Sequence, residues 1–236
     1  ERKMNKQVIA IVGPTASGKT DLSVALAKAI DGEVINGDSM QVYRELNIGT
    51  AKIKEEEMQG VPHHYFDRLE PTASFSVAEY QRDVRTYIEE ISTRGKTPII
   101  VGGTGLYVQS VLYDFRFTDE GSDEQVRQRL EKEASEMGKE AMHQRLLAID
   151  PQSANDIHPN NLRRVIRALE VYEVTGQTKS DIDQSRGQKK IYPSVIFGLS
   201  MPREQLYERI DLRVDLMIRD GLEEEVRALY MNGVRE

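Results

Sequence analysis

Apolar and polar positions follow one another along the chain in blocks that predict alternating strands and helices. An unbroken apolar run covers residues 8–12, and residues 21–30 then carry apolar side chains at helical spacing. Two more short segments, 33–36 and 97–101, have the pattern of strands and flank a long helix-periodic stretch over residues 76–94. Strands that alternate with helices predict an α/β fold, with a parallel sheet, right-handed crossovers and helices on both faces.

The long helical stretch carries its own end signals. Ser76 is followed three residues later by Glu79, the pattern of a capping box at a helix N-terminus. Gly95 comes directly after the last periodic residue, where a left-handed backbone ends many helices. The sequence therefore predicts both ends of this helix.

The pattern changes in the second half of the chain. Three polar, charged and helix-periodic segments succeed one another without an apolar run between them, over residues 123–137, 139–149 and 160–175. A strand pattern returns within 191–201, and a helix follows from Pro202. We predict a core interrupted by a helical insertion, with the first part of the core, the insertion and the return to the core over residues 1–118, 119–188 and 189–236.

Composition limits the function classes only in part. The 236 residues are 39% hydrophobic and include no cysteine, which excludes disulfides and thiolate metal sites. No apolar run reaches the roughly 20 residues of a membrane span, so we expect a cytoplasmic protein without a membrane partner, and nothing demands more than a monomer. The formal charge of −7 argues against nonspecific nucleic-acid binding, but a local basic face stays possible.

A glycine-containing segment joins the first predicted strand to the first helix and has the pattern of a phosphate-binding P-loop. Its residues are Gly13, Pro14, Thr15, Ala16, Ser17, Gly18, Lys19 and Thr20. The glycines let successive N–H groups point inward, and the helix adds the positive end of its dipole. Lys19 is suited to neutralise a diphosphate or triphosphate, and the Thr20 hydroxyl to hold Mg²⁺. The alternative is a strand-to-helix turn that binds nothing.

Two more polar positions follow predicted strands. Asp38 comes just after the strand over 33–36, where its carboxylate is suited to accept a proton from a nucleophile. It could instead cap the following turn or act as an outer partner of magnesium. Thr104 lies in a Gly-Gly-Thr-Gly segment after the strand over 97–101 and is suited to contact a second phosphate oxygen, or simply to cap a helix.

The type of reaction is indicated partly by what is missing. ATPases and GTPases usually complete the magnesium site with an acidic residue at the end of an apolar strand, whereas the run over 99–101 ends in glycines. This favours transfer of a group from a diphosphate over hydrolysis of a nucleotide. Arg209 and Arg213 lie four residues apart on one helix face and could bind a leaving diphosphate together, or form a solvated face.

The densest basic cluster lies in the predicted insertion. It is a candidate contact for an RNA backbone and consists of Arg163, Arg164, Val165, Ile166 and Arg167. The alternative is a charged helix whose arginines pair with Glu170 and Glu173.

Taken in order, these segments resemble one family, the tRNA dimethylallyltransferases. The resemblance covers essentially the whole chain and rests on residues 13–20, 38–44, 47–52, 101–107, 158–160, 164, 167–171, 209, 213 and 221–226. It implies a P-loop core with a helical insertion that embraces the anticodon stem-loop of tRNA. It also implies that family chains continue beyond residue 236, so we expect this sequence to lack a C-terminal segment.

The resemblance further implies a reaction and its residues. Dimethylallyl diphosphate would occupy the P-loop, and the exocyclic amine of the adenine 3′ to the anticodon would attack it, giving N6-isopentenyladenosine. Asp38 would be the general base, and Thr20 would hold Mg²⁺. The diphosphate would be bound by Lys19, Thr104 and Arg213, with Arg209 beside them. The residues implied to contact tRNA are Asp38, Ser39, Met40, Gln41, Thr104, Arg127, Arg163, Arg164, Val165, Ile166 and Arg167.

Three other functions stay open from the sequence. An adenylate isopentenyltransferase uses the same core with a free nucleotide as acceptor, but the insertion and its arginines favour tRNA. A small-molecule kinase shares the P-loop and an acidic base and uses ATP as donor. A noncatalytic P-loop module would bind RNA and form no product.

Overall fold

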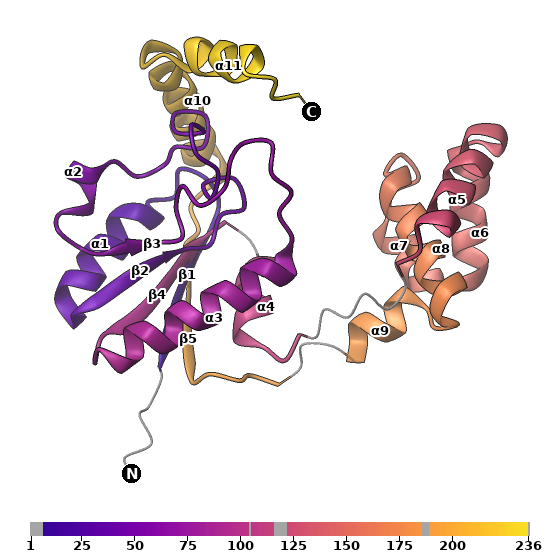
Figure 1. Ribbon diagram of the computed structural model, residues 1–236, viewed down its shortest axis with the longest axis horizontal. Helices are drawn as coiled ribbons and strands as arrows, with labels where there is room; N and C mark the ends of the chain where they lie inside the picture. The colour runs from indigo at the N-terminus through magenta and orange to yellow at the C-terminus, as the bar shows by residue number, and fades with distance from the viewer. Residues whose placement is uncertain (1–6, 104, 116–121, 186–188, 236) are drawn as a thin grey trace. The chain divides into compact units, whose positions relative to one another are not determined.

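Five parallel strands form one sheet in the order β3-β2-β4-β1-β5 (Figure 1). The computed structural model describes residues 7–103, 105–115, 122–185 and 189–235. Within them the strands are β1 (Val8–Val12), β2 (Gly32–Asn36), β3 (His63–His64), β4 (Thr97–Gly102) and β5 (Ser194–Gly198). The predicted α/β fold with a parallel sheet is confirmed.

Helices cover both faces of this sheet because neighbouring apolar residues of each strand point in opposite directions. In β4, Ile100 packs with α3 (Val77–Thr93) and α4 (Gly105–Leu112), whereas Ile99 packs with α1 (Lys19–Ile30) on the other face. Both side chains are fully buried. The unbroken apolar runs of the sequence are thus explained by burial on two sides.

The ends of α3 are those that the sequence predicts. Ser76 is the N-cap, and its hydroxyl accepts a hydrogen bond from the Glu79 amide while the Glu79 carboxylate accepts one from the Ser76 amide. Gly95 follows in the left-handed region with φ of 75°. Capping chemistry is local, so it can be read from sequence.

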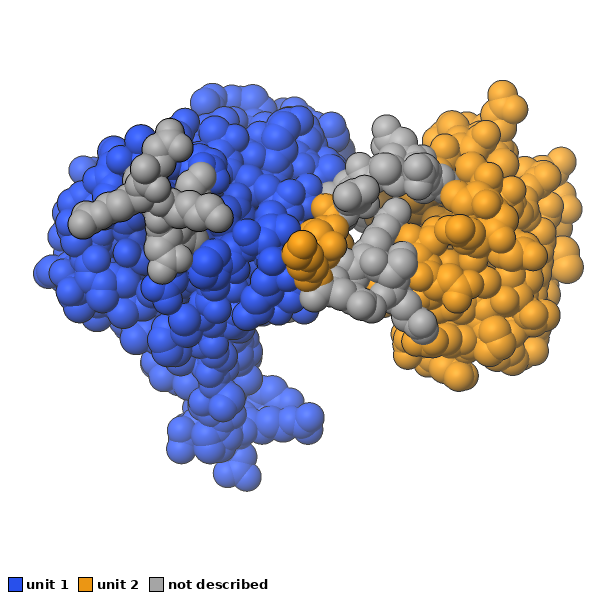
Figure 2. Space-filling model, turned by 90° about the horizontal axis from the view of Figure 1, so that it is seen from below, with its two compact units in different colours: residues 1–113, 190–236 blue, residues 114–189 orange. Residues whose placement is uncertain are grey.

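A second compact unit, which we call the helical unit, spans residues 114–189, and the rest of the chain forms the core unit (Figure 2). The helical unit contains α5 (Glu124–Met137), α6 (Lys139–Ile149), α7 (Pro151–Asp156), α8 (Leu162–Thr175) and α9 (Lys179–Ser185). Its apolar side chains form a core of their own, including Leu130, Met142, Leu146, Val165 and Leu169. α7 and α9 escaped the sequence analysis because they are too short to show a helical period.

A buried carboxylate ties α5 to α8 in the helical unit. Glu170 is fully buried and accepts hydrogen bonds from the Asp123 amide at 3.0 Å, from Arg127 at 3.0 Å and from Arg167 at 2.8 Å. Burial alone would raise the pKa of Glu170, but these hydrogen bonds outweigh it and the net pKa lies below its ordinary value. A charge buried in this way is stable only while its partners remain.

Two helices follow β5 in the part of the chain that the structure describes. α10 (Arg203–Arg219) and α11 (Leu222–Met231) are separated at Gly221, whose φ of 104° breaks the helix. None of the described side chains of either helix is buried, and β5 is an exposed edge strand. Among the residues described, no helix combines the length and the apolar character needed to cross a bilayer.

Candidate active site

The segment between β1 and α1 has the backbone of a phosphate-binding loop. Ala16 and Gly18 adopt left-handed conformations, with φ of 63° and 92°, and curl the chain into the first turn of α1. The Lys19 ammonium folds back over the loop and donates to the carbonyls of Gly13, at 2.8 Å, and Pro14, at 2.6 Å. The loop therefore encloses a positive charge beside the positive end of a helix dipole.

Two hydroxyl groups in and beside the loop indicate which kind of ligand the loop suits. The Ser17 hydroxyl oxygen is buried and makes no hydrogen bond to any described residue, which a polar ligand in the loop could satisfy. Thr20 is exposed in the first turn of α1. An oxygen donor of this kind beside a diphosphate suits Mg²⁺, which binds through few protein ligands and keeps several waters. The donor set present thus fits a magnesium diphosphate.

Charged residues from early and late parts of the core unit influence the ammonium group of Lys19. Burial lowers the pKa of Lys19, the positive charge of Arg213 on α10 lowers it further, and the negative charge of Asp38 opposes both. The charges of Arg213 and Asp38 thus both act on Lys19, although the three residues come from separate parts of the chain. Arg209 is exposed, and Thr104 lies outside the described residues.

Asp38 is fixed at the end of β2 by its neighbours. The buried Asn36 side chain accepts from the Asp38 amide at 2.9 Å and donates to the carbonyls of Asp38 and Tyr65. One carboxylate oxygen of Asp38, Oδ1, accepts from the amides of Met40 at 2.7 Å and Gln41 at 3.3 Å. Asp38 thus caps the following turn, and the same bonds hold its carboxylate in one orientation.

The position of Asp38 at the end of β2 depends on how closely β2 approaches β4. Gly37 donates its amide to the Val101 carbonyl at 2.7 Å. A Cβ built on Gly102 would lie 2.5 Å from the Gly37 oxygen, and one built on Gly37 would lie 2.9 Å from the Val101 oxygen. The two backbones are so close that only glycine fits at either position.

Aromatic rings pack beside the Asp38 segment. Tyr80 and Tyr107 meet edge to face at 4.9 Å between ring centroids, and Phe75 stacks on Tyr107 at 6.1 Å. The Tyr80 hydroxyl donates to the Asn36 carbonyl, and the Ser39 side chain lies beside Tyr107. Burial raises the pKa of both tyrosines, so they stay neutral. The site therefore combines charged groups with a rigid aromatic wall.

The residues expected to contact the acceptor extend from Asp38 into a turn. Met40 is exposed, whereas Ser39 and Gln41 are half-buried. The Gln41 side chain donates to the Thr50 carbonyl at 2.8 Å. This hydrogen bond connects the segment Asp38–Gln41, which we call the acceptor segment, to the turn formed by residues 47–52.

The basic cluster of the helical unit divides into two groups. Arg163 and Arg164 are exposed on α8. Val165 and Ile166 are 0% and 6% exposed and pack in the core of the unit. The expectation that Val165 and Ile166 contact RNA is therefore wrong for their side chains, because the helical period turns them inward.

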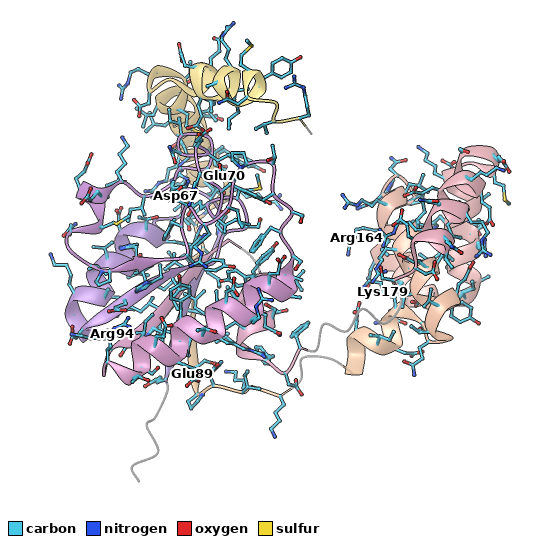
Figure 3. The ribbon with its side chains drawn as sticks, viewed as in Figure 1. Asp67, Glu70, Glu89, Arg94, Arg164 and Lys179 are labelled. Atoms are coloured by element: carbon cyan, nitrogen blue, oxygen red, sulfur yellow. The ribbon has the colours of Figure 1, made fainter. Side chains whose placement is uncertain are left out.

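Ion pairs engage some of the basic side chains that were predicted to contact RNA. Arg127 and Arg167 pair with Glu170, as the charged-helix alternative requires, but Glu173 pairs with Arg145 and with Arg129 rather than with the cluster. Arg164 lines a cavity of about 270 Å³ with residues of α7 and α9, including Lys179 (Figure 3). Arg163 and Arg164 are the members of the cluster best placed to meet a phosphate backbone.

Sequence reasoning missed three functional neighbours. Asn36 orients Asp38, Tyr107 contacts Ser39, and Glu225 on α11 binds the amides of residues 47–49. Asn36 was recognisable as a polar residue that ends an apolar run. The contact of Glu225 spans more than 170 residues of sequence and has no local signal.

Comparisons with known proteins agree on one family. The sequence model of IPP transferase matches residues 41–236. A tRNA dimethylallyltransferase of Bacillus cytotoxicus is 55% identical over all 236 residues, which cover 75% of the relative. A solved tRNA isopentenylpyrophosphate transferase of Bacillus halodurans is 50% identical with a TM-score of 0.69, and 98% of this chain covers 72% of it. A solved eukaryotic dimethylallyltransferase acting on tRNA is 34% identical with a TM-score of 0.78, over 96% of this chain and 56% of that one.

Proposed function

Because this chain belongs to the IPP transferase family, we propose that it prenylates tRNA. It transfers a dimethylallyl group from dimethylallyl diphosphate to the exocyclic amine of the adenine 3′ to the anticodon. The observation that carries the proposal is the phosphate-binding loop with the Lys19 ammonium folded over it, on which the charges of Arg213 and Asp38 also act, because two cations and one carboxylate are what the two halves of this reaction need.

The donor half takes place at the P-loop. Its amides, with Lys19 and Arg213, bind the diphosphate and stabilise the negative charge that grows on it as the allylic C–O bond breaks. Thr20 would hold Mg²⁺, which supplies further positive charge at the diphosphate when bound. The protein thus assists departure of the leaving group without a hydrolytic water.

The acceptor half takes place at Asp38. The adenine amine attacks the allylic carbon, a C–N bond forms as the C–O bond breaks, and one amine proton passes to the carboxylate. The hydrogen bonds from Met40 and Gln41 both use Oδ1, so Oδ2 is the oxygen suited to take the proton. An adenine held in a stack cannot reach this position, so it must be flipped out of the anticodon loop.

The aromatic wall has a part in this chemistry. Phe75 and Tyr107 are half-buried and present ring surface beside the Asp38 segment, where water would otherwise compete with the adenine amine for the allylic carbon, and the fully buried Tyr80 packs against Tyr107. Because the tyrosines remain neutral, they add no charge that would compete with the diphosphate for the cations.

The test is a prenyl-transfer assay with mass spectrometry. The protein is incubated with magnesium, dimethylallyl diphosphate and an unmodified anticodon stem-loop, with AMP and with ATP plus nucleosides in parallel tubes. We expect one five-carbon unit on an adenine of the RNA, and a loss of about a hundredfold to ten-thousandfold in rate for Asp38→Ala with RNA binding retained. Modified AMP alone would support the free-nucleotide branch, phosphate transfer the kinase, and RNA binding without any product the noncatalytic module.

A further inference from the structure

One carboxylate of α11 accepts three consecutive backbone amides. Glu225 Oε2 accepts from Asn47 at 3.0 Å and from Ile48 at 2.8 Å, and Oε1 accepts from Gly49 at 3.0 Å. Three N–H groups that point at one anion form the kind of backbone nest that proteins use to bind phosphate. Here the protein fills the nest with its own side chain, so the position of the 47–52 turn depends on α11.

Packing supports the same contact. A Cβ built on Gly49 would lie 3.2 Å from Leu222 Cδ1 and 3.6 Å from Glu225 Oε1, so α11 lies directly against the turn. The Ile48 side chain reaches to within 3.9 Å of a Cβ built on Gly221. The helix break at Gly221 therefore directs α11 onto this turn.

The turn is also fixed from its inner side. The Lys52 ammonium, whose side chain is 6% exposed, donates to the Tyr43 carbonyl at 2.6 Å, to Asn47 Oδ1 at 3.0 Å and to Asp67 Oδ1 at 2.5 Å. Two backbone hydrogen bonds, from Ala51 to the Ile48 carbonyl and from Lys52 to the Asn47 carbonyl, complete the turn. Because the 47–52 turn is held on both sides, a displacement of α11 would move the turn as a whole.

The path from this turn to the reaction centre is short. The Thr50 carbonyl accepts from the Gln41 side chain at 2.8 Å, and the Gln41 amide donates to Asp38 Oδ1. We propose that Glu225 is a positioning residue that holds the 47–52 turn and, through Gln41, sets the Asp38–Gln41 segment against the acceptor base. This role rests on the proposed function. It gives the α10–α11 pair two tasks, since α10 also carries Arg213 to the diphosphate end.

The test compares Glu225→Gln with Glu224→Gln. Both variants remove one negative charge from the first turns of α11, but Glu224 is exposed and the described contacts give it no bond to the 47–49 amides. A glutamine at 225 keeps the size of the side chain and replaces one acceptor oxygen with a donor that faces an amide. Hydrogen exchange of the peptide over residues 44–52 reports on the turn, and steady-state kinetics with both substrates report on the reaction.

For Glu225→Gln we expect faster exchange of the 44–52 peptide and about a tenfold fall in kcat/KM for the RNA, because the acceptor segment loses its orientation. KM for dimethylallyl diphosphate stays within about twofold, since the P-loop is untouched, and Glu224→Gln behaves as wild type. Glu225→Asp keeps the charge on a shorter arm and gives an intermediate effect, which also serves if the glutamine variant does not fold.

Unchanged exchange in Glu225→Gln would overturn the proposal. Faster exchange with unchanged kinetics would overturn it as well, because the carboxylate would then be only structural. Failure of the proposed function looks different: wild type, Glu224→Gln and Glu225→Gln would all lack prenyl transfer, whereas failure of the inference alone leaves all three equally active.

Discussion

The contact between Gly37 and Gly102 allows a prediction about both stability and catalysis. A Cβ at residue 102 would meet the Gly37 oxygen at 2.5 Å, its carbonyl carbon at 2.7 Å and its Cα at 2.9 Å. All three atoms belong to backbone, so no rotamer change relieves the clash. Gly102→Ala must therefore push β2 and β4 apart at their carboxyl ends.

The size of the effect follows from these distances. Real Cβ atoms essentially never lie closer than 3.0 Å to such neighbours, so the Gly37 backbone must move by at least about 0.5 Å and strain its hydrogen bond to Val101. We expect Gly102→Ala to lower the free energy of unfolding by about 2 kcal/mol, which lowers Tm by on the order of 5 °C. Asp38 directly follows Gly37 and moves with it, and if Asp38 is the proposed general base, misplacing it by about half an ångström lowers kcat by roughly tenfold.

The adjacent glycine provides the matched control for stability. A Cβ built on Gly103 meets no atom within 4 Å, so Gly103→Ala leaves Tm close to that of wild type. Thermal unfolding and the prenyl-transfer assay measure both effects. If Gly102→Ala has the Tm and kcat of wild type, the close approach of β2 and β4 does not control the position of Asp38.

Three further predictions concern the charged groups. Lys19→Ala lowers turnover by on the order of a hundredfold or more while RNA affinity is retained, since the variant loses the cation enclosed by the P-loop; equal turnover would refute the role. Glu170→Ala lowers the free energy of unfolding by about 2 kcal/mol at pH 7, as it removes the buried acceptor of two half-exposed arginines and a backbone amide. Because the pKa of Glu170 is lowered in the fold, its contribution is complete above the ordinary carboxyl pKa of about 4.3 and is lost as pH falls through the folded-state value. Urea unfolding of both proteins at pH 7 and at acid pH should show the difference shrink, and a constant difference would contradict this assignment. Arg164→Ala reduces the slope of log K against log salt for the stem-loop by about one without changing Tm, and an unchanged slope would return Arg164 to a merely solvated face.

Local chemistry decides which parts of this structure could be predicted from sequence. The P-loop, the capping box of α3 and the apolar runs of the inner strands each depend on residues close together in the chain, and the structure has them where the patterns indicate. β3 is a two-residue strand and carries no period at all. The sequence pattern indicates no boundary between the last helices at Gly221, because the apolar positions of α10 and α11 continue through it.

The features that could not be predicted depend on contacts between residues far apart in the sequence. Asp38 could be recognised as a polar residue after a strand, but the side chains that orient it and the closeness of Lys19 and Arg213 follow from strand order and helix direction. For Arg127 and Arg167, the same charge pattern fits RNA binding and ion pairing, and the pairing with the buried Glu170 is seen only in the structure.

The connection between the two units makes the helical unit an exchangeable module. The chain leaves the core unit at Tyr113 and returns at Lys190, and these residues form an antiparallel bridge, with the Ile191 amide bonded to the Leu112 carbonyl. On the other side of the boundary, the Asp114 amide bonds to the Lys189 carbonyl at 3.0 Å. Two chain ends held side by side can be joined by a short hairpin turn at little entropic cost. A core unit closed in this way would keep Lys19, Asp38 and Arg213. The activity of these residues could then be measured in the absence of the arginine-bearing helices.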